Sequence, residues 1–176
     1  PPLILPKQKI STMSCGQRAQ VALGLILAQD PDLLILDDFS LGLDPGYRRL
    51  FIDYMREYCK AKGKTVFLTS HIIQDMGRLI DDVLIMDYNR VLVQGPVKDF
   101  TDKFKGFTFD LERDDIIFSD SLAVNVEHIN NHYEFYTYGD ETEVKKLLET
   151  QGLPYSNFTQ LDMTLEDAFI GLTGKY

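Results

Sequence analysis

Two adjacent acids and a histidine stand where residues of these types can do chemistry. Asp37 and Asp38 follow the apolar run of residues 33–36, and His71 closely follows a second apolar run at residues 65–69. A carboxylate at the carboxyl end of a parallel strand faces the crevice in which α/β proteins bind ligands. A neutral imidazole can donate to a phosphate and orient a nucleophile without the full proton transfer of a general base. The alternative for the acids is a solvated strand end, and a lone histidine is more often structural.

A serine-glycine turn could supply an anion site. Ser14 precedes a long apolar segment, and Gln17 lies three residues after Ser14. This is the spacing of a capping box, so we expect a helix to begin at Ser14. The first amides of a helix are free and the positive end of its dipole points outward. Gly16 would let a phosphate approach closely. The alternative is an ordinary capped core helix.

Alternating helices and strands must position these groups. The pattern predicts a helix from Ser14 that ends before Pro31 and is buried nearly all round, and a second helix over residues 47–61. It predicts apolar strands over residues 33–36, 65–69 and 82–86, and a hairpin return over residues 90–93. Such strands, alternating with helices, indicate an α/β fold with a parallel sheet that is covered on both faces.

The composition changes after Phe104. Short segments of alternating polarity occupy residues 107–111, 122–126 and 132–138, and helical patterns follow near residues 143–151 and 164–172. These segments predict a small α+β appendage, joined to the first part at residues 105–106.

Charge and composition exclude several classes of protein. The 176 residues include 18 basic and 27 acidic side chains, a net charge of −9, which argues against gripping nucleic acid through the general surface. Cys15 and Cys59 are too few for a disulfide framework and fit a reducing compartment. No segment approaches the roughly 18 apolar residues of a membrane span. We therefore expect an acidic cytosolic chain.

Taken in order, the motifs resemble the second half of an ATP-binding cassette (ABC) ATPase, the nucleotide-binding domain of ABC transporters. The series consists of residues 13–17 (MSCGQ), the strand that ends in Asp37 and Asp38, residues 40–45 (SLGLDP) and residues 69–71 (TSH). The resemblance covers about residues 10–95. It implies that residues 1–105 form the C-terminal half of a P-loop NTPase domain with parallel core strands, and that residues 106–176 form an accessory α+β domain.

The resemblance implies binding roles at the signature motif and the D-loop. Ser14 and Gly16 would cover the γ-phosphate of ATP bound to the opposite subunit, with Gln17 in support. Cys15 stands where the family pattern has glycine, which limits backbone freedom. Asp44 matches the aspartate that crosses the dimer interface. Its structural alternative is to cap the helix that follows, and both roles could hold at once.

The resemblance also implies catalytic roles. Asp37 matches the Walker B aspartate, which holds Mg²⁺ directly or through water. Asp38 occupies the position of the catalytic glutamate that polarises the attacking water, and it reaches one methylene less far. His71 matches the switch histidine, which contacts the γ-phosphate and positions that water.

Two motifs of the family are absent from this sequence. A Walker A loop needs Gly-x-x-x-x-Gly-Lys-Ser/Thr. Residues 63–65 (GKT) match only its end, because Tyr58 occupies the place of the first glycine and the triplet precedes a strand. A Q-loop is likewise missing. We therefore expect the chain to be the C-terminal part of an ABC ATPase and to be inactive by itself.

Residues 164–174 resemble the closing helix of exporter-type ABC ATPases. The family as a whole implies ATP and Mg²⁺ as cofactors, a second, identical ATPase subunit, and an integral membrane permease, with no nucleic acid partner. It implies a cytoplasmic location, peripheral at the inner face of the cell membrane. Two alternatives stay open: a degenerate or regulatory ABC module that completes a partner's ATP site, and a soluble ABC ATPase outside transport.

Overall fold

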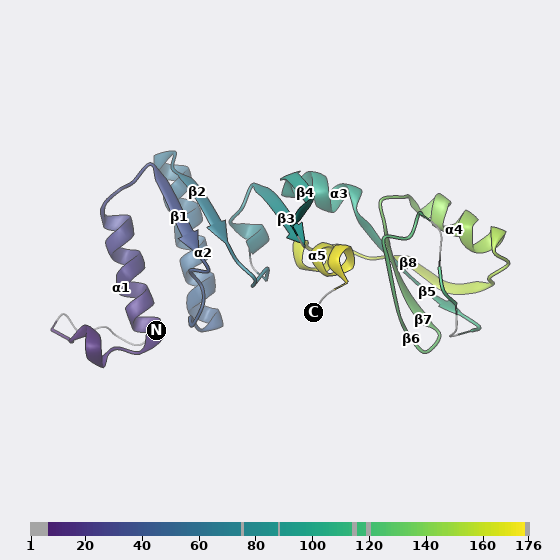
Figure 1. The fold of residues 1–176 in the computed structure, drawn as a ribbon, viewed down its shortest axis with the longest axis horizontal. Coiled ribbons are helices and arrows are strands. Elements are labelled where there is room, and N and C mark those ends of the chain that lie inside the picture. Colours follow the sequence, from purple (N-terminus) through teal and green to yellow (C-terminus); the bar gives the residue numbers. More distant parts are fainter. Residues whose placement is uncertain (1–6, 75, 88, 114–115, 119–120, 175–176) are drawn as a thin grey trace. The chain divides into compact units, whose positions relative to one another are not determined.

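The chain divides into two compact units, residues 1–79 and residues 80–176 (Figure 1). The computed structural model describes residues 7–74, 76–87, 89–113, 116–118 and 121–174. The sequence predicts a domain boundary at residues 105–106, whereas compactness groups the segment of residues 80–105 with the second unit. The assignment of residues 1–105 to one domain stays a prediction.

The first unit is built on a pair of parallel strands. Its elements are η1 (Ile10–Thr12), α1 (Cys15–Ala28), β1 (Leu33–Asp37), α2 (Pro45–Lys62), β2 (Thr65–Thr69) and η2 (Met76–Arg78). β1 and β2 pair in parallel, and α2 is the crossover between them. A core of Leu23, Leu34, Leu36, Phe51 and Met55 joins α1, β1 and α2. The predicted α/β character and the parallel core strands are confirmed.

Local sequence signals explain where the two long helices begin and end. Ser14 is the N-cap of α1 and forms the predicted capping box with Gln17. Asp44 is the N-cap of α2 and is followed by Pro45, whose fixed φ suits the first helical position. Gly63 ends α2 in the left-handed conformation, with a φ of 62°.

The sheet of the first unit is covered on one face in the described structure. Leu34 and Leu36 face the helices, whereas Leu33 and Ile35 on the other face are 52% and 71% exposed and Phe67 of β2 is 61% exposed. In α1 only Leu23 is buried, and Leu25 is exposed. The expected burial of β1 on both faces and of α1 all round is therefore wrong for the described residues, because both helices pack on the same side of the strands.

The second unit begins with a hairpin. β3 (Asp82–Asp87) and β4 (Arg90–Pro96) pair antiparallel, which confirms the predicted return strand. Asn89 in the turn has a φ of 67°, and Tyr88 lies outside the described residues. Among the strands that the structure describes, β3 pairs only with β4, so it is not seen in the parallel sheet in which the sequence places it.

The rest of the second unit is an α+β sandwich. Its elements are α3 (Val97–Lys103), β5 (Lys105–Leu111), β6 (Asn125–Ile129), β7 (His132–Thr137), α4 (Glu141–Thr150), β8 (Tyr155–Gln160) and α5 (Leu165–Thr173). The four strands form an antiparallel sheet in the order β6-β7-β5-β8. The predicted α+β character is confirmed, although β6 begins later than expected and α3 and β8 have no counterpart in the prediction.

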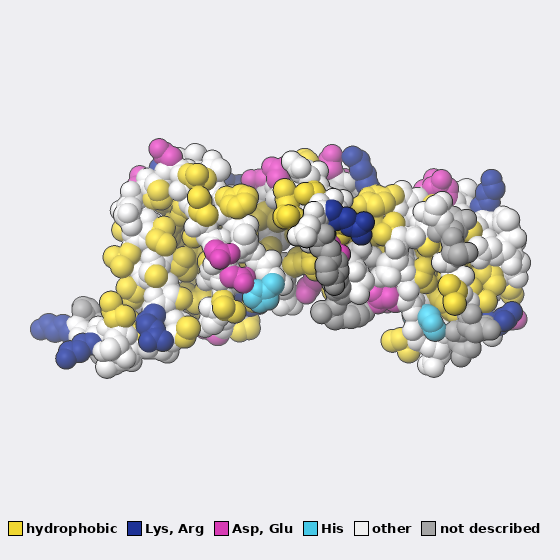
Figure 2. Space-filling model, viewed as in Figure 1, with side chains coloured by type: hydrophobic (Ala, Val, Ile, Leu, Met, Phe, Trp, Pro, Cys, Tyr) yellow, Lys and Arg dark blue, Asp and Glu magenta, His cyan; other side chains and the backbone are white. Residues whose placement is uncertain are grey.

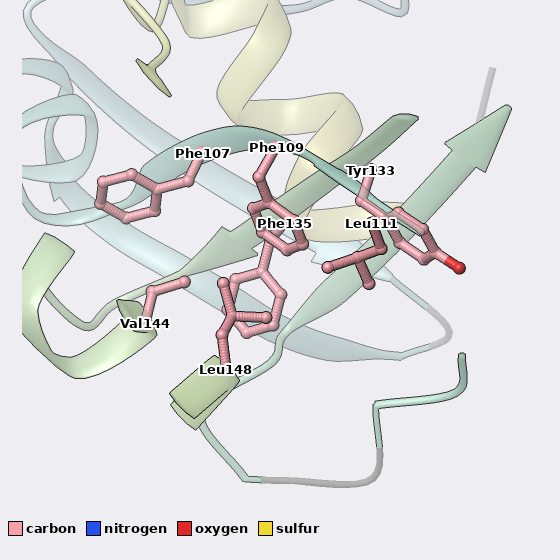
Figure 3. Packing of buried hydrophobic residues seen from close by; sticks show 7 residues of the cluster. All are labelled: Phe107, Phe109, Leu111, Tyr133, Phe135, Val144 and Leu148. Atoms are coloured by element: carbon pink, nitrogen blue, oxygen red, sulfur yellow. The ribbon is translucent and has the colours of Figure 1, made fainter. Parts of the chain in front are cut away.

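An aromatic core holds this sheet to α4 (Figure 3). Alternation along β5 turns Phe107, Phe109 and Leu111 to one face, where Tyr133 and Phe135 of β7 join them. Val144 and Leu148 of α4 cover this layer. The core explains why the segment of alternating polarity at residues 107–111 folds as a half-covered strand.

An ionic clamp ties the turn after α1 to the end of α2. Asp30 Oδ1 accepts hydrogen bonds from Lys62 Nζ at 2.9 Å and from the Tyr58 hydroxyl at 2.7 Å. These bonds, chiefly that from Lys62 and then that from Tyr58, lower the pKa of Asp30 to about 2. The same carboxylate raises the pKa of Tyr58 to about 12.

The first unit should lose stability in acid through this clamp. The pKa of Asp30 is about 2 in the folded chain and about 3.9 in an unfolded one, so the clamp stabilises fully above about pH 4 and is lost as the pH falls towards 2. We expect Asp30→Asn to reduce the loss of unfolding free energy between pH 5 and about 2.5, measured by urea titration followed by circular dichroism. Glu57→Gln, an exposed change on α2, the helix that carries Tyr58 and Lys62, is the control. An Asp30→Asn chain with the pH dependence of the wild type would contradict the prediction.

Candidate functional site

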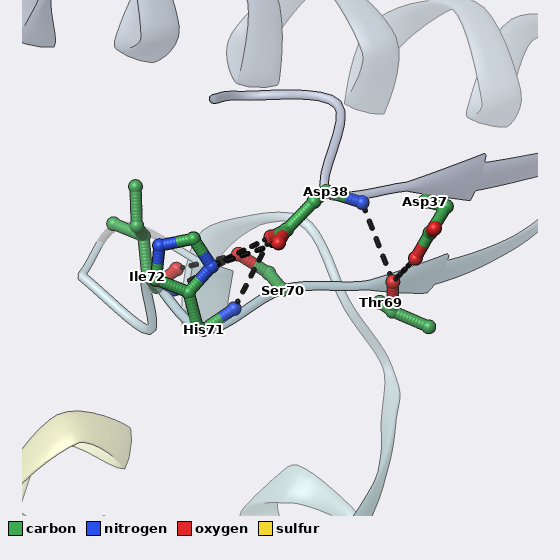
Figure 4. Close-up of polar contacts among 6 residues, drawn as sticks. All are labelled: Asp37, Asp38, Thr69, Ser70, His71 and Ile72. Atoms are coloured by element: carbon green, nitrogen blue, oxygen red, sulfur yellow. Dashed lines mark hydrogen bonds and ion pairs between the residues drawn. The ribbon is translucent and has the colours of Figure 1, made fainter. Parts of the chain in front are cut away.

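The carboxyl ends of β1 and β2 bring two acids and a histidine together (Figure 4). Asp37, the last residue of β1, lies opposite Thr69, the last residue of β2. Asp38 and His71 follow directly beyond these strand ends, and their side chains are in contact. Because the two strands are parallel, both end at the same edge of the sheet. The structure thus places Asp37, Asp38 and His71 at one edge, as the sequence pattern predicts.

The side chains of Asp38 and His71 lie within ion-pair distance of each other at the surface. His71 Nδ1 lies 2.9 Å from both carboxylate oxygens of Asp38, and the His71 backbone N–H donates to Oδ1 at 3.4 Å. An ionised carboxylate only accepts, so Nδ1 carries the proton in this contact. The neutral ring then offers Nε2 as an acceptor, and Nε2 donates to a phosphate only when the ring carries a second proton. This refines the expectation that the neutral imidazole is the donor.

Asp37 keeps one oxygen available for a ligand. Its Oδ1 accepts a hydrogen bond from the Thr69 hydroxyl, and the other oxygen has no hydrogen-bond partner among the described residues. Mg²⁺ prefers oxygen ligands and is commonly held by one or two carboxylates together with substrate phosphates. No cluster of three metal-binding side chains occurs in the part of the chain that the structure describes. The second oxygen of Asp37 is chemically suited to be one such ligand of Mg²⁺.

A left-handed turn directs the Asp38 side chain. Asp38 has a φ of 45°, a conformation that aspartate tolerates better than most residues. Its backbone N–H donates to the Thr69 carbonyl at 3.1 Å and lies 3.3 Å from the Thr69 hydroxyl. The sequence assigned no role to Thr69. No sequence signal identifies it, because its position opposite Asp37 depends on the register of β1 against β2.

The turn that carries His71 is shaped by Ser70. The Ser70 hydroxyl accepts from the Ile72 backbone N–H at 3.0 Å and donates to the Ile72 carbonyl at 3.1 Å. These contacts fix the short segment after β2 in which the histidine lies.

The start of α1 has the features of an anion site. Gln17 N–H donates to Ser14 Oγ at 3.2 Å, and Ser14 N–H donates to Gln17 Oε1 at 3.0 Å. The amides of Cys15 and Gly16 have no acceptor within the described residues. The first turn contains no acidic side chain. Two free amides at an exposed helix start are compatible with a bound phosphate.

The loop between β1 and α2 lies against the start of α1. Gly42 has a φ of 79°, and a Cβ on it would lie 3.1 Å from Cys15 Sγ, so glycine suits this position. A Cβ on Gly16 would lie 3.5 Å from the Gly42 carbonyl oxygen. No hydrogen bond in the described part of the chain joins Ser14 to Asp37, Asp38 or His71. The signature turn, residues 13–17, lies against the loop that follows Asp38.

Asp44 and Lys64 have structural partners. Asp44 Oδ1 accepts from the Tyr47 N–H at 3.0 Å, which confirms its capping role, while a role at a dimer interface stays a prediction. Lys64 Nζ donates to Asp32 Oδ1 at 2.9 Å and to the Asp30 carbonyl at 3.0 Å. Residues 63–65 connect α2 to β2, so they do not form the strand-to-helix loop of a Walker A motif.

The surface over β1 and β2 shows acidic side chains beside a histidine, with hydrophobic side chains around them (Figure 2). None of the described helices is both long and apolar enough to span a bilayer.

Comparison with known proteins gives consistent matches. The family model described as "AAA domain, putative AbiEii toxin, Type IV TA system" matches residues 6–74. Nod factor export ATP-binding protein I of Ralstonia nicotianae is 28% identical over 174 residues, which are 94% of this chain and 54% of the relative. The protein of the same name from Rhizobium meliloti is 30% identical, over 95% of this chain and 50% of the relative. The thiamine import ATP-binding protein ThiQ of a Jannaschia species is 34% identical over 53% of this chain and 41% of the relative.

The chain spans about half the length of the curated relatives that it matches. The family model covers the unit that contains the two acids, the histidine and the signature turn. Over 94–95% of its own length, the chain is similar to the ATP-binding proteins of ABC transporters, and these matches support an ABC ATPase fragment.

Proposed function

We propose that this chain works in a subunit that binds and hydrolyses ATP to drive an ABC transporter. The observation that carries the proposal is the meeting of Asp37, Asp38 and His71 at one edge of two parallel strands. This edge is where open α/β sheets bind ligands. The relatives are named as ATP-binding proteins of transport systems, which supports the same activity.

Each member of the site has a distinct task in this proposal. Asp37 would hold Mg²⁺ through its unpartnered oxygen, and the ion would neutralise charge that develops on the transferring phosphoryl group. Asp38 would orient the attacking water. His71 would hold the Asp38 carboxylate in place and, when protonated, donate to the γ-phosphate from Nε2.

The signature turn would act on a second subunit. The free amides of Cys15 and Gly16 and the Ser14 hydroxyl would cover the γ-phosphate of ATP held by an identical chain, with Gln17 fixing the turn. This arrangement is a head-to-tail dimer with Asp44 near the interface.

The remaining partner would be a membrane permease. We place the subunit in the cytoplasm, at the inner face of the cell membrane. The net charge of −9 suits docking on a protein better than docking on anionic lipid. We propose export as the direction, because the relatives matched over 94% and 95% of the chain are named for export, whereas the import relative matches 53%.

Phosphate release in the presence of Mg²⁺ tests the proposal in the full-length protein. We expect saturable ATP turnover there, and neither turnover nor tight ATP binding by residues 1–176 alone, because residues 1–176 contain no Walker A sequence. Titration calorimetry measures the second expectation. A full-length protein that fails to bind Mg²⁺-ATP would overturn the proposed function.

One observation favours a second candidate, a degenerate module that completes a partner's ATP site. Asp38 is shorter than the glutamate of the family pattern, and both of its oxygens contact His71. A full-length protein that binds ATP without hydrolysing it would favour this candidate.

A further inference from the structure

We infer that Thr69 is a positioning residue that holds both acids of the site through its hydroxyl group. The inference rests on the proposed ATPase function and deepens it. The role of Thr69 is indirect, because it acts through Asp37 and Asp38.

The Thr69 hydroxyl lies between the two acids. It donates its proton to Asp37 Oδ1, and the Asp38 backbone N–H approaches its oxygen at 3.3 Å (Figure 4). A hydroxyl has one proton to donate and two lone pairs to accept, so both contacts can form at once. The parallel register fixes this position, because Thr69 lies directly opposite Asp37.

The contact with Asp37 orients the carboxylate. With Oδ1 bonded to the hydroxyl, rotation of the carboxylate is restricted and its second oxygen is left for Mg²⁺. Hydrogen bonds to a ligating carboxylate are part of a metal site, and their removal typically costs roughly 10- to 100-fold in metal affinity or activity.

The contact with Asp38 supports its left-handed backbone. A non-glycine residue with a φ of 45° persists when its surroundings fix it. The N–H of Asp38 is held by the Thr69 carbonyl at 3.1 Å and by the hydroxyl. This conformation directs the Asp38 carboxylate to His71, so the one hydroxyl supports both the metal ligand and the acid-histidine pair.

Thr69 is exposed, so packing does not account for it. Valine has nearly the same shape and β propensity but lacks the hydroxyl, whereas serine keeps the hydroxyl and loses the methyl group. Thr69→Val and Thr69→Ser therefore separate the hydrogen bonds from the side-chain volume. Thr65→Val, at the other end of β2, is a matched control.

The test uses the full-length protein and two readouts. Steady-state phosphate release gives kcat and KM for ATP, and electron paramagnetic resonance gives the affinity for Mn²⁺ in the presence of a non-hydrolysable ATP analogue. We expect Thr69→Val to lower both kcat and Mn²⁺ affinity about 10-fold or more, with KM for ATP changed much less. In Thr69→Ser, kcat and Mn²⁺ affinity should stay within about threefold of the wild-type values. In Thr65→Val, both should equal the wild-type values.

Wild-type kcat and Mn²⁺ affinity in Thr69→Val would overturn the inference and leave the proposed function intact. Equal losses in Thr69→Ser and Thr69→Val would also overturn it, because a variant that keeps the hydroxyl would then be as defective as one that lacks it. A wild-type protein with neither turnover nor Mn²⁺-nucleotide binding would overturn the proposed function itself.

Discussion

Asp38→Asn should lower the kcat of ATP hydrolysis by the full-length protein by about 10²-fold or more, the range typical for loss of a group that assists proton transfer. Asparagine keeps the size of the side chain but removes the charge that attracts His71 Nδ1, which lies 2.9 Å from both carboxylate oxygens. Nucleotide affinity should change little, because Asp38 acts on the attacking water. Phosphate release and ATP titration measure the two quantities separately.

Asp38→Glu and His71→Ala complete the experiment. Glutamate restores the reach of the family pattern, so turnover should persist in Asp38→Glu. Asp38 and His71 are hydrogen-bonded partners. The double variant Asp38→Asn/His71→Ala should therefore lose little more turnover than Asp38→Asn or His71→Ala alone. Turnover that is unchanged in Asp38→Asn would contradict the catalytic assignment. A wild-type protein that binds ATP but lacks turnover, which Asp38→Glu then restores, would favour the degenerate module.

The location of the site could be predicted from the sequence because it depends on local signals. Two apolar runs predict strands, the residues after them predict the edge, and Ser14 with Gln17 predicts the start of α1. Each of these features is set by neighbours in the chain. The structure has all of them.

The contacts within the site could not be predicted in this way. The hydrogen bonds of Thr69 to both acids depend on the register of β1 against β2, which places residues 32 positions apart side by side. The left-handed turn at Asp38 has no glycine to signal it. The choice of ring nitrogen on His71 likewise follows from the position of the Asp38 carboxylate.

The sequence-based predictions that differ most from the structure concern the elements that cover or pair with each strand. A continuous apolar run predicts burial on both faces, yet Ile35 and Phe67 are exposed in the described structure. The same signal led β3 to be placed in the parallel sheet, whereas it pairs with β4. An apolar run in the sequence indicates that a strand favours burial, but it does not identify the element that covers the strand. The bare face of β1 and β2 fits a chain that spans half the length of its relatives.

Phe109 lies at the centre of the aromatic core of the second unit. It is fully buried, and its ring centroid lies 5.9 Å from that of Tyr133, 5.8 Å from that of Phe158 and 6.3 Å from that of Phe135. These neighbours come from β7 and β8, the two strands that flank β5. A cavity at this position would remove contacts with both strands at once.

Phe109→Ala should therefore destabilise the second unit by about 3–5 kcal/mol, the range for truncation of a buried phenylalanine. The rings around Phe109 are held by strand pairing on both sides, so they can close the cavity only in part. Urea unfolding followed by tyrosine fluorescence measures the change. Ile129→Ala on the same sheet, where the side chain is 79% exposed, should change stability by about 0.5 kcal/mol or less. A loss below about 1 kcal/mol in Phe109→Ala would mean that this core is not what holds β5, β7 and β8 together.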